Sequence, residues 1–384
     1  MVCIPATMHT HHLKTGARDG VRAMLIVDSH LDLSLNALQG NRDLLRSAYT
    51  IRSQEQSAPG KGRAQGTVAL PEMRQGRIAL SFATVLARST GHPEPHIDFA
   101  TPAQAHGIAK GQLAYYHAME RQGHIRTIRS LAQLDAHMTE WTAWDGRHPG
   151  EETGSSPPLG IVISMESADA VIEPAELRDW WEGGLRLIGP AHFGPGRYAG
   201  GTGCELGLTE LGAALLSEMG RVGIILDLTH CSDQAFWEAL ARYDGPVHAS
   251  HNNCRALNPH QRQLSDTQIH AIIERDGVIG TVPGCWQLKP GWRNGDSNDS
   301  TNLADMVAHI DHICQIAGTS SHVGIGSDLD GGVGREGFAH DLDTIADLQK
   351  VGVLLAGRGY TGGDVSAIMH GNWVRFLKHA WGAA

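Results

Sequence analysis

Short apolar runs alternate with amphipathic segments along the chain, and this alternation restricts the fold more than any other feature of the sequence. The apolar runs are rich in β-branched residues and predict strands near residues 23–28, 77–85, 159–165, 185–191, 222–229, 246–250, 277–282 and 322–327. Helical periodicity predicts helices over residues 104–121, 170–183, 208–219, 233–242, 265–275, 302–316, 340–356 and 363–380. Strands that alternate with helices pair in parallel, so these units predict an α/β fold, a single (β/α)8 TIM-like barrel. An open doubly wound sheet is the alternative.

Local signals refine this layout. Ser265 begins the sequence Ser-Asp-Thr-Gln, a capping-box pattern that predicts a helix start with Gln268 at the third helical position. The segment Trp144–Pro158 is rich in Gly, Pro and Ser, and we expect a loop there that leads from inserted helices into the third strand. We therefore expect one barrel domain over residues 21–384, preceded by a flexible tail over residues 1–20.

The net charge and the cysteines of the chain limit which classes of partner and which cellular location we expect. A formal net charge of −10 argues against a nucleic-acid surface and against an anionic membrane surface. The sequence has no apolar run of transmembrane length and no signal-peptide stretch, so we expect no membrane partner. Its six cysteines are scattered without a C-x-x-C pair, which predicts reduced thiols and a cytoplasmic protein. Small-molecule substrates remain as partners, and a homodimer is possible.

A His-x-Asp pair ends the first predicted strand. Side chains alternate across a strand, so His30 and Asp32 face the same way and can bind one divalent cation together. Such a triplet also arises by chance, and a histidine at a strand end is often only a hydrogen-bonded residue near a loop. The chain holds 23 histidines, more than its tyrosines, phenylalanines and tryptophans combined, which makes a metal or acid–base site more plausible.

Polar side chains also end other predicted strands. These side chains belong to Glu166, His192, His230, His251 and Asp328. In a barrel of this type the carboxyl ends of the strands meet at one mouth. Each residue alone could be a helix-terminal charge or a satisfied near-core histidine. Together they would bring carboxylates and imidazoles into one desolvated place, which costs several kcal/mol unless they are paired or metal-bound.

This set of residues suits two cations better than one. His30 and Asp32 can serve the first cation, His230 and His251 can serve the second, and Glu166 could bridge both with its two oxygens. Two cations roughly 3.5–4 Å apart can share a hydroxide for hydrolysis at a carbonyl or phosphoryl centre. Histidine and carboxylate ligands without cysteine suit Zn²⁺ best, with Mn²⁺ or Co²⁺ as alternatives.

Short motifs occur in a characteristic order along the chain. They are Asp28-Ser29-His30-Leu31-Asp32, Met165-Glu166, Ala191-His192, Asp227-Leu228-Thr229-His230, Ser250-His251 and Gly326-Ser327-Asp328-Leu329-Asp330-Gly331. This order resembles that of the membrane (renal) dipeptidase family, and in particular its bacterial members, from about Ala23 to about Trp381. The resemblance implies a metal-dependent hydrolase barrel that holds two zinc ions and cleaves dipeptides, with L,D-dipeptides among the candidate substrates.

The resemblance also implies roles for single residues. The implied metal ligands are His30, Asp32, Glu166, His230 and His251, with Glu166 as the bridge. His192 matches the histidine that polarises the scissile carbonyl, Asp328 matches the acid–base aspartate, and all three of His192, Asp328 and Arg262 would contact the substrate. Arg262 matches the arginine that pairs with the substrate carboxylate. Arg255 is its alternative, because the segment Asn252–Gln261 contains no distinctive motif.

A mechanism follows from these roles. A metal-bridging hydroxide would attack the peptide carbon, Asp328 would pass its proton to the leaving amine, and His192 would stabilise the oxyanion. Asp28 and Asp330 are expected to orient ligands rather than to bind metal.

Two other functions stay open from the residues. One is another binuclear amidohydrolase on the same barrel, such as a deaminase or lactonase, although many of those begin with His-x-His where this chain has His30-Leu31-Asp32. The other is a protein whose metals only brace the barrel. A closed structural site would leave no spare histidine or aspartate nearby, whereas His192 and Asp328 are spare.

Overall fold

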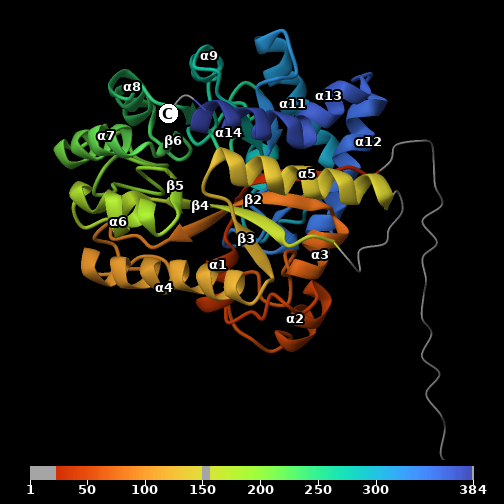
Figure 1. Ribbon diagram of the computed structural model, residues 1–384, viewed down its shortest axis with the longest axis horizontal. Coiled ribbons are helices and arrows are strands. Elements are labelled where there is room, and N and C mark those ends of the chain that lie inside the picture. The colour runs from red at the N-terminus through yellow and green to blue at the C-terminus, as the bar shows by residue number, and fades with distance from the viewer. Residues whose placement is uncertain (1–22, 149–155, 383–384) are drawn as a thin grey trace, which may run out of the picture.

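Parallel strands form a nearly closed barrel in the computed structural model, which describes residues 23–148 and 156–382 (Figure 1). The barrel strands are β1 (Ile26–Leu31), β2 (Ile78–Leu86), β4 (Leu159–Glu166), β5 (Leu185–Ile188), β6 (Ile225–Asp227), β7 (Val247–His248), β8 (Ile279–Thr281) and β9 (Val323–Ile325). They pair in parallel in the order β7-β6-β5-β4-β2-β1-β9-β8. Each of the eight predicted strands is present, and the predicted TIM-like barrel is confirmed.

The two ends of this sheet meet between β7 and β8. Ala249 forms an isolated parallel bridge with Ile279. The Ala249 N–H donates to Val278 O at 3.1 Å, and the Gly280 N–H donates to Ala249 O at 2.8 Å. This short seam closes the ring, so an open doubly wound sheet does not describe the fold.

An extra strand and two long helices lie between β2 and β4. The helices are α4 (Pro102–Arg121) and α5 (Leu131–Arg147), and the strand is β3 (Ile125–Thr127), which pairs with the first residues of β4. The strand was not predicted. The predicted loop Trp144–Pro158 begins later than expected, because α5 continues to Arg147. Its residues 149–155 lie outside the described residues, as does the predicted tail over residues 1–20.

The remaining helices follow the predicted segments, and some are shorter than predicted. They are α6 (Leu177–Glu182), α7 (Glu210–Val222), α8 (Asp233–Arg242), α9 (Asp266–Glu274), α11 (Leu303–Ala317), α12 (Gln349–Gly357), α13 (Gly362–Ser366) and α14 (Asn372–Gly382). The capping box of Ser265 with Gln268 is present at the start of α9. The helix predicted over residues 340–356 begins only after Thr344, whose side chain and Asp347 form a capping box.

Other differences from the predicted helices are local. Short 3₁₀ turns, Ala168–Ala170 and Pro174–Glu176, replace the start of the helix predicted over residues 170–183. A π-helical segment at Ala367–Gly371 joins α13 directly to α14. Short helices that the sequence did not predict are α1 (Leu33–Leu38), α2 (Ala48–Gln54), α3 (Leu70–Gln75) and α10 (Cys285–Leu288). Within the described ranges, no helix combines the length and apolar character needed to cross a lipid bilayer.

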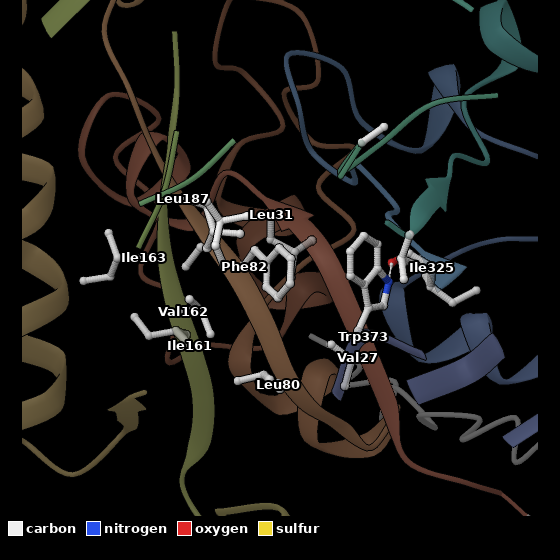
Figure 2. Packing of buried hydrophobic residues seen from close by; sticks show 14 of the residues in the cluster. Val27, Leu31, Leu80, Phe82, Ile161, Val162, Ile163, Leu187, Ile325 and Trp373 are labelled. Carbon is white, nitrogen blue, oxygen red and sulfur yellow. Dashed lines mark hydrogen bonds between the residues drawn. The ribbon is translucent and has the colours of Figure 1, made fainter. Parts of the chain in front are cut away.

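The core packs apolar strand residues against α14 (Figure 2). The rings of Phe82 and Trp373 lie 5.2 Å apart at 72°, and Trp373 Nε1 donates to Ile325 O at 3.0 Å. A β-carbon at Gly324 would collide with this indole, so the close approach of α14 to β9 requires glycine there. Burial of each large apolar side chain contributes about 2 kcal/mol to the free energy of folding. The packed core fixes the strands whose carboxyl ends carry polar side chains.

Candidate metal centre

The predicted ligands come together at the carboxyl ends of the strands. His30 lies in β1, Asp32 directly follows it, and Glu166 is the last residue of β4. His192, His230, His251 and Asp328 follow β5, β6, β7 and β9 respectively. The chain therefore brings residues as far apart as 30 and 328 to one end of the barrel.

Glu166 lies at the centre of this group. Its Oε1 is 3.1 Å from His230 Nε2, 3.4 Å from His251 Nε2 and 3.7 Å from His192 Nε2. Its Oε2 is 3.6 Å from His30 Nε2. The histidines hold the pKa of Glu166 well below its usual range although burial opposes them. The two carboxylate oxygens therefore face different histidines.

The donor atoms form three overlapping sets, each compact enough to hold an ion. In each set the donor atoms lie within 4.8 Å of one another, and the sets are His30 with Glu166 and His251, Glu166 with His192 and His230, and His30 with Asp32 and Asp328. Glu166 and His30 each belong to two sets. The arrangement can therefore accommodate neighbouring cations that share a ligand.

Three carboxylates, those of Glu166, Asp32 and Asp328, act on the imidazole of His30. Burial would lower the pKa of His30, but Glu166, Asp32 and Asp328 outweigh it and raise this pKa to about 10. Burial and Glu166 raise the pKa of Asp32 to about 6, although His30 opposes them. His30 Nε2 is buried and has no hydrogen-bond partner. A divalent cation fits here, because it would bind this free nitrogen and neutralise the carboxylates.

His230 and His251 present matching nitrogens to the site. Their Nε2 atoms lie 3.1 Å apart. The Nδ1 of His230 is 3.0 Å from the Thr202 hydroxyl, and the Nδ1 of His251 is 2.8 Å from the Ser250 hydroxyl. Burial holds the pKa of both imidazoles well below the usual range. If each Nδ1–H donates to its hydroxyl, both Nε2 lone pairs face the site, as metal binding requires.

Asp328 stands at the edge of the same centre. Its Oδ1 is 3.7 Å from His30 Nε2, and its side chain is 20% exposed. Burial and the neighbouring carboxylates of Glu166 and Asp32 hold its pKa well above the usual range. A carboxylate with a raised pKa accepts a proton more readily than an ordinary one, which suits acid–base chemistry.

The backbone is left-handed at two of the candidate functional residues. The φ angle is 66° at His230 and 54° at Asp328. This conformation is uncommon for residues other than glycine, and aspartate and histidine tolerate it better than most. Strain of this type persists where the surrounding structure imposes it, and it gathers at functional sites.

The structure separates the two candidate arginines. Arg262 is buried, its Nη2 donates to His251 O at 2.8 Å, and its Nε and Nη1 have no hydrogen-bond partner. Burial lowers the pKa of Arg262 to about 10. Arg255 instead pairs with Asp233 at 2.9 and 2.7 Å, at the start of α8. Only Arg262 of this pair adjoins the candidate metal centre.

The two additional aspartates have different partners. Asp28 accepts the Ser327 N–H and hydroxyl at 2.9 and 2.5 Å, and also the His30 N–H at 3.2 Å. It therefore fixes the backbone of a candidate ligand, as expected. Asp330 accepts the N–H groups of Thr67 and Val68 and the Thr67 hydroxyl. Its carboxylate holds this loop rather than the side chain of a predicted ligand.

Several supporting residues were missed by the sequence analysis. The Thr84 hydroxyl donates to Asp32, and the Arg88 guanidinium contacts His192 Nδ1 at 3.1 Å. Thr202 and Ser250 contact the other two histidines, as described above. Thr84 and Arg88 lie at the carboxyl end of the second predicted strand, where no functional residue was proposed. Their position at the mouth of the predicted barrel is the only feature of the sequence that could have marked them as functional.

Comparison with known protein families agrees with the resemblance seen in the sequence motifs. The model of the membrane dipeptidase family, peptidase family M19, matches residues 16–383 of this chain. An uncharacterised protein in the pqqA 5′ region of Klebsiella pneumoniae is 31% identical over 232 residues, which cover 58% of this chain and 83% of the relative. Dipeptidase aclJ of Aspergillus oryzae is 26% identical over 321 residues, which cover 81% of this chain and 69% of the relative.

Solved structures have the same architecture. The dipeptidase AC, a metallopeptidase of family M19, is 25% identical with a TM-score of 0.73, and the match covers 94% of this chain and 99% of that one. A metallopeptidase from Rhodobacter sphaeroides, solved with a phosphinate mimic of the dipeptide L-Ala-D-Ala, is 24% identical. Its TM-score is 0.72, and the match covers 94% of this chain and all of the neighbour.

Proposed function

The chain belongs to the membrane dipeptidase family and is a metal-dependent hydrolase of dipeptides, and on this premise we propose that it binds two zinc ions. The family match favours this activity over the deaminase and lactonase alternatives. Histidine and carboxylate donors without cysteine support zinc over the other divalent metals, with Mn²⁺ or Co²⁺ as the competing outcomes of a metal analysis.

In this proposal His30 and Asp32 hold one ion and His230 and His251 hold the other, with Glu166 shared between them. The observation that carries it is the position of the Glu166 carboxylate, whose Oε2 faces His30 and whose Oε1 faces His230 and His251. The bound ions would supply Lewis acidity, which activates water for attack and polarises the scissile carbonyl.

Arg262 is the proposed partner of the substrate carboxylate. Its buried guanidinium has two nitrogens without hydrogen-bond partners, and a carboxylate is the ligand that a guanidinium fork fits best. Leaving such donors unpaired in a dry site costs free energy, so substrate binding would be favoured by satisfying them. A fixed carboxylate site beside the reacting centre would also limit the length of the peptide.

Asp328 and His192 are the proposed catalytic residues. Asp328 would accept a proton from the attacking water and pass it to the leaving amine, which its raised pKa supports. Burial lowers the pKa of His192 to about 4, so its imidazole is neutral at neutral pH. A neutral imidazole can donate one hydrogen bond to the carbonyl oxygen as negative charge develops there.

A substrate panel tests the proposed site as a whole. Zinc-loaded protein should hydrolyse free L,L- or L,D-dipeptides. It should act poorly on dipeptide amides, which lack the carboxylate proposed to bind Arg262, and on N-acetylated dipeptides and lactones. Equal rates on dipeptides and their amides would reject the carboxylate site.

We also propose a cytoplasmic location, supported by the free cysteines Cys204, Cys231, Cys254, Cys285 and Cys314. The homodimer stays a prediction, which sedimentation analysis of the purified protein would test.

A further inference from the structure

Arg88 contacts the imidazole of His192 on its Nδ1 side. Arg88 Nη1 lies 3.1 Å from His192 Nδ1, whereas His192 Nε2 is 3.7 Å from Glu166 Oε1. Arg88 follows β2 and is buried, with 7% of its surface exposed. The imidazole therefore has the arginine on one ring nitrogen and the candidate metal centre on the other.

The guanidinium is held in place by its own partners. Arg88 Nη2 is 3.3 Å from Glu94 Oε2, and Arg88 Nε is 3.4 Å from Asp98 Oδ2. The backbone of Arg88 donates to Ile97 O and accepts from the Phe99 N–H, each at 2.8 Å. These contacts tie the arginine to the loop that contains Glu94 and Asp98, so its position does not depend on His192 alone.

The contact determines which nitrogen of His192 carries the proton. A guanidinium has only N–H donors and stays protonated in proteins, so His192 Nδ1 must accept the hydrogen bond with its lone pair. The proton of the neutral imidazole must then be on Nε2, the nitrogen that faces the site.

A second arginine in the molecule contacts a histidine Nδ1, and there the tautomer of the histidine follows from its other contact. Arg126 Nη1 lies 3.2 Å from His137 Nδ1, and His137 Nε2 lies 2.7 Å from Ala79 O. A carbonyl oxygen can only accept, so His137 must carry its proton on Nε2. The arginine contact on Nδ1 therefore occurs together with the tautomer that we assign to His192.

His192 differs in this respect from His230 and His251. The Nδ1 atoms of those two residues face the hydroxyls of Thr202 and Ser250, which can accept a proton. Their Nε2 atoms are then free to bind metal, whereas a protonated Nε2 on His192 cannot. His192 belongs to one of the compact donor sets, so distance alone does not distinguish the two roles.

We propose that Arg88 is a positioning residue that keeps His192 in the Nε2–H form, so that His192 donates to the substrate carbonyl instead of binding metal. This inference rests on the proposed role of His192. It assigns to Arg88 no contact with substrate or metal.

The first test measures the tautomer directly in the full-length zinc-loaded protein. Histidine nitrogen chemical shifts measured by NMR should identify His192 as the Nε2–H tautomer, with the signal assigned by its loss in His192→Gln. In Arg88→Met the signal should shift toward the other tautomer or a mixture. A wild-type His192 that carries its proton on Nδ1, or that binds zinc, would overturn the proposal even if every Arg88 variant failed to fold.

The second test separates action through His192 from a structural effect. Arg88→Met should lower kcat by about 10- to 10²-fold, with zinc content near wild type, because a misdirected donor loses part of the oxyanion stabilisation. In the His192→Gln background the same change should have no further effect. Arg126→Met is the matched control, since it breaks an equivalent contact with His137 away from the site, and it should leave kcat unchanged.

Further variants complete the interpretation. Arg88→Lys keeps a charged donor and should retain more activity than Arg88→Met. A loss of zinc in Arg88→Met, or an equal slowing in both backgrounds, would give Arg88 a structural or independent role and reject the proposal. If His192→Gln is fully active, the proposed role of His192 fails instead. If His192→Gln is slow and Arg88→Met is not, only the inference about Arg88 fails.

Discussion

His230 and His251 point their Nε2 atoms at each other across 3.1 Å. Each of these histidines has a hydroxyl at its Nδ1, which can accept the ring proton. Two lone pairs at this separation repel each other unless a proton or a cation lies between or beside them. Arg262 Nη2 lies 3.3 Å from His230 Nε2 and can donate to it. A cation bound by both imidazoles would satisfy both nitrogens, so we expect metal binding to stabilise this end of the barrel.

Removing the shared carboxylate should affect both metal sites. Glu166→Gln should bring zinc content from close to two ions per chain to well below one, because only a shared ligand serves both ions. Elemental analysis after dialysis measures this, in a background with His9→Ala, His11→Ala and His12→Ala to remove adventitious ligands. Wild-type protein that is fully active with one ion per chain would reject the binuclear site.

Two neighbouring aspartates should respond differently to the same substitution. Asp328→Asn should lower kcat by about 10²-fold or more with zinc content retained, since asparagine cannot accept the proton. Asparagine also tolerates the left-handed backbone at this position, where φ is 54°. Kinetics and elemental analysis on the same sample test this. Loss of zinc would instead make Asp328 a ligand.

Asp330→Asn should mainly reduce stability. The Asp330 carboxylate accepts hydrogen bonds from Thr67 and Val68 and pairs with Arg42 at 3.3 Å, all in a buried place. An amide cannot accept all of these bonds, so we expect unfolding to become easier by about 2–4 kcal/mol. Urea unfolding measures this change. A fall in kcat as large as that of Asp328→Asn, without loss of stability, would contradict the assignment.

The two arginines should also separate in kinetics. Arg262→Met should raise KM for free dipeptides by about 10²-fold, because it removes a charge-assisted partner of the carboxylate, with zinc content unchanged. Arg255→Met should leave KM near wild type, since Arg255 is already paired with Asp233. Steady-state kinetics of both variants shows which arginine binds the substrate carboxylate. The opposite pattern would transfer the role to Arg255.

A buried histidine should make stability fall in mild acid. Burial lowers the pKa of His309 from the ordinary value of 6.5 to about 4, and its Nδ1 accepts the Cys254 N–H at 3.1 Å. Because the unfolded chain binds the proton more readily, this contribution is fully present above pH 6.5 and is lost as the pH falls from 6.5 toward 4. The loss should reach roughly 2–3 kcal/mol.

His309→Asn isolates this contribution, because asparagine can still accept the Cys254 N–H but does not titrate. The difference in urea unfolding between pH 7 and pH 5 should be smaller in the variant than in wild type, by about 1–2 kcal/mol. His270→Asn changes an exposed histidine on α9 and serves as the control. Equal pH dependence in wild type and His309→Asn would reject this account.

The strands were predictable because each barrel strand lies within or beside a short run of mostly apolar residues in the sequence. β3 was missed since Ile125–Thr127 is too short for an alternating pattern to be recognised. The predicted ligands were recognisable as polar residues at strand ends, and the structure brings them together. Thr84 and Arg88 could not be recognised in the same way, because neither is a usual metal ligand and their function depends on contacts with distant residues.

The choice between Arg262 and Arg255 depended on loop geometry. The Asn252 side chain donates to Arg262 O, and the Arg255 N–H donates to Leu264 O. These contacts turn one arginine toward the barrel mouth and the other toward α8. No periodic pattern in the sequence encodes such a loop path.

The narrow closure between β7 and β8 has a consequence for motion. The pairing of β2 with β4 continues over residues 80–86 of β2, whereas the closure depends on a bridge at Ala249, close to His251. A weakly paired junction opens locally before the rest of a barrel. If His251 binds a cation that residues of other strands also hold, as we propose, opening this junction would require a coordination bond to break. A bound cation would then hold the junction between β7 and β8 closed. Amide hydrogens at this junction, such as that of Gly280, should exchange with solvent faster once the cation is removed.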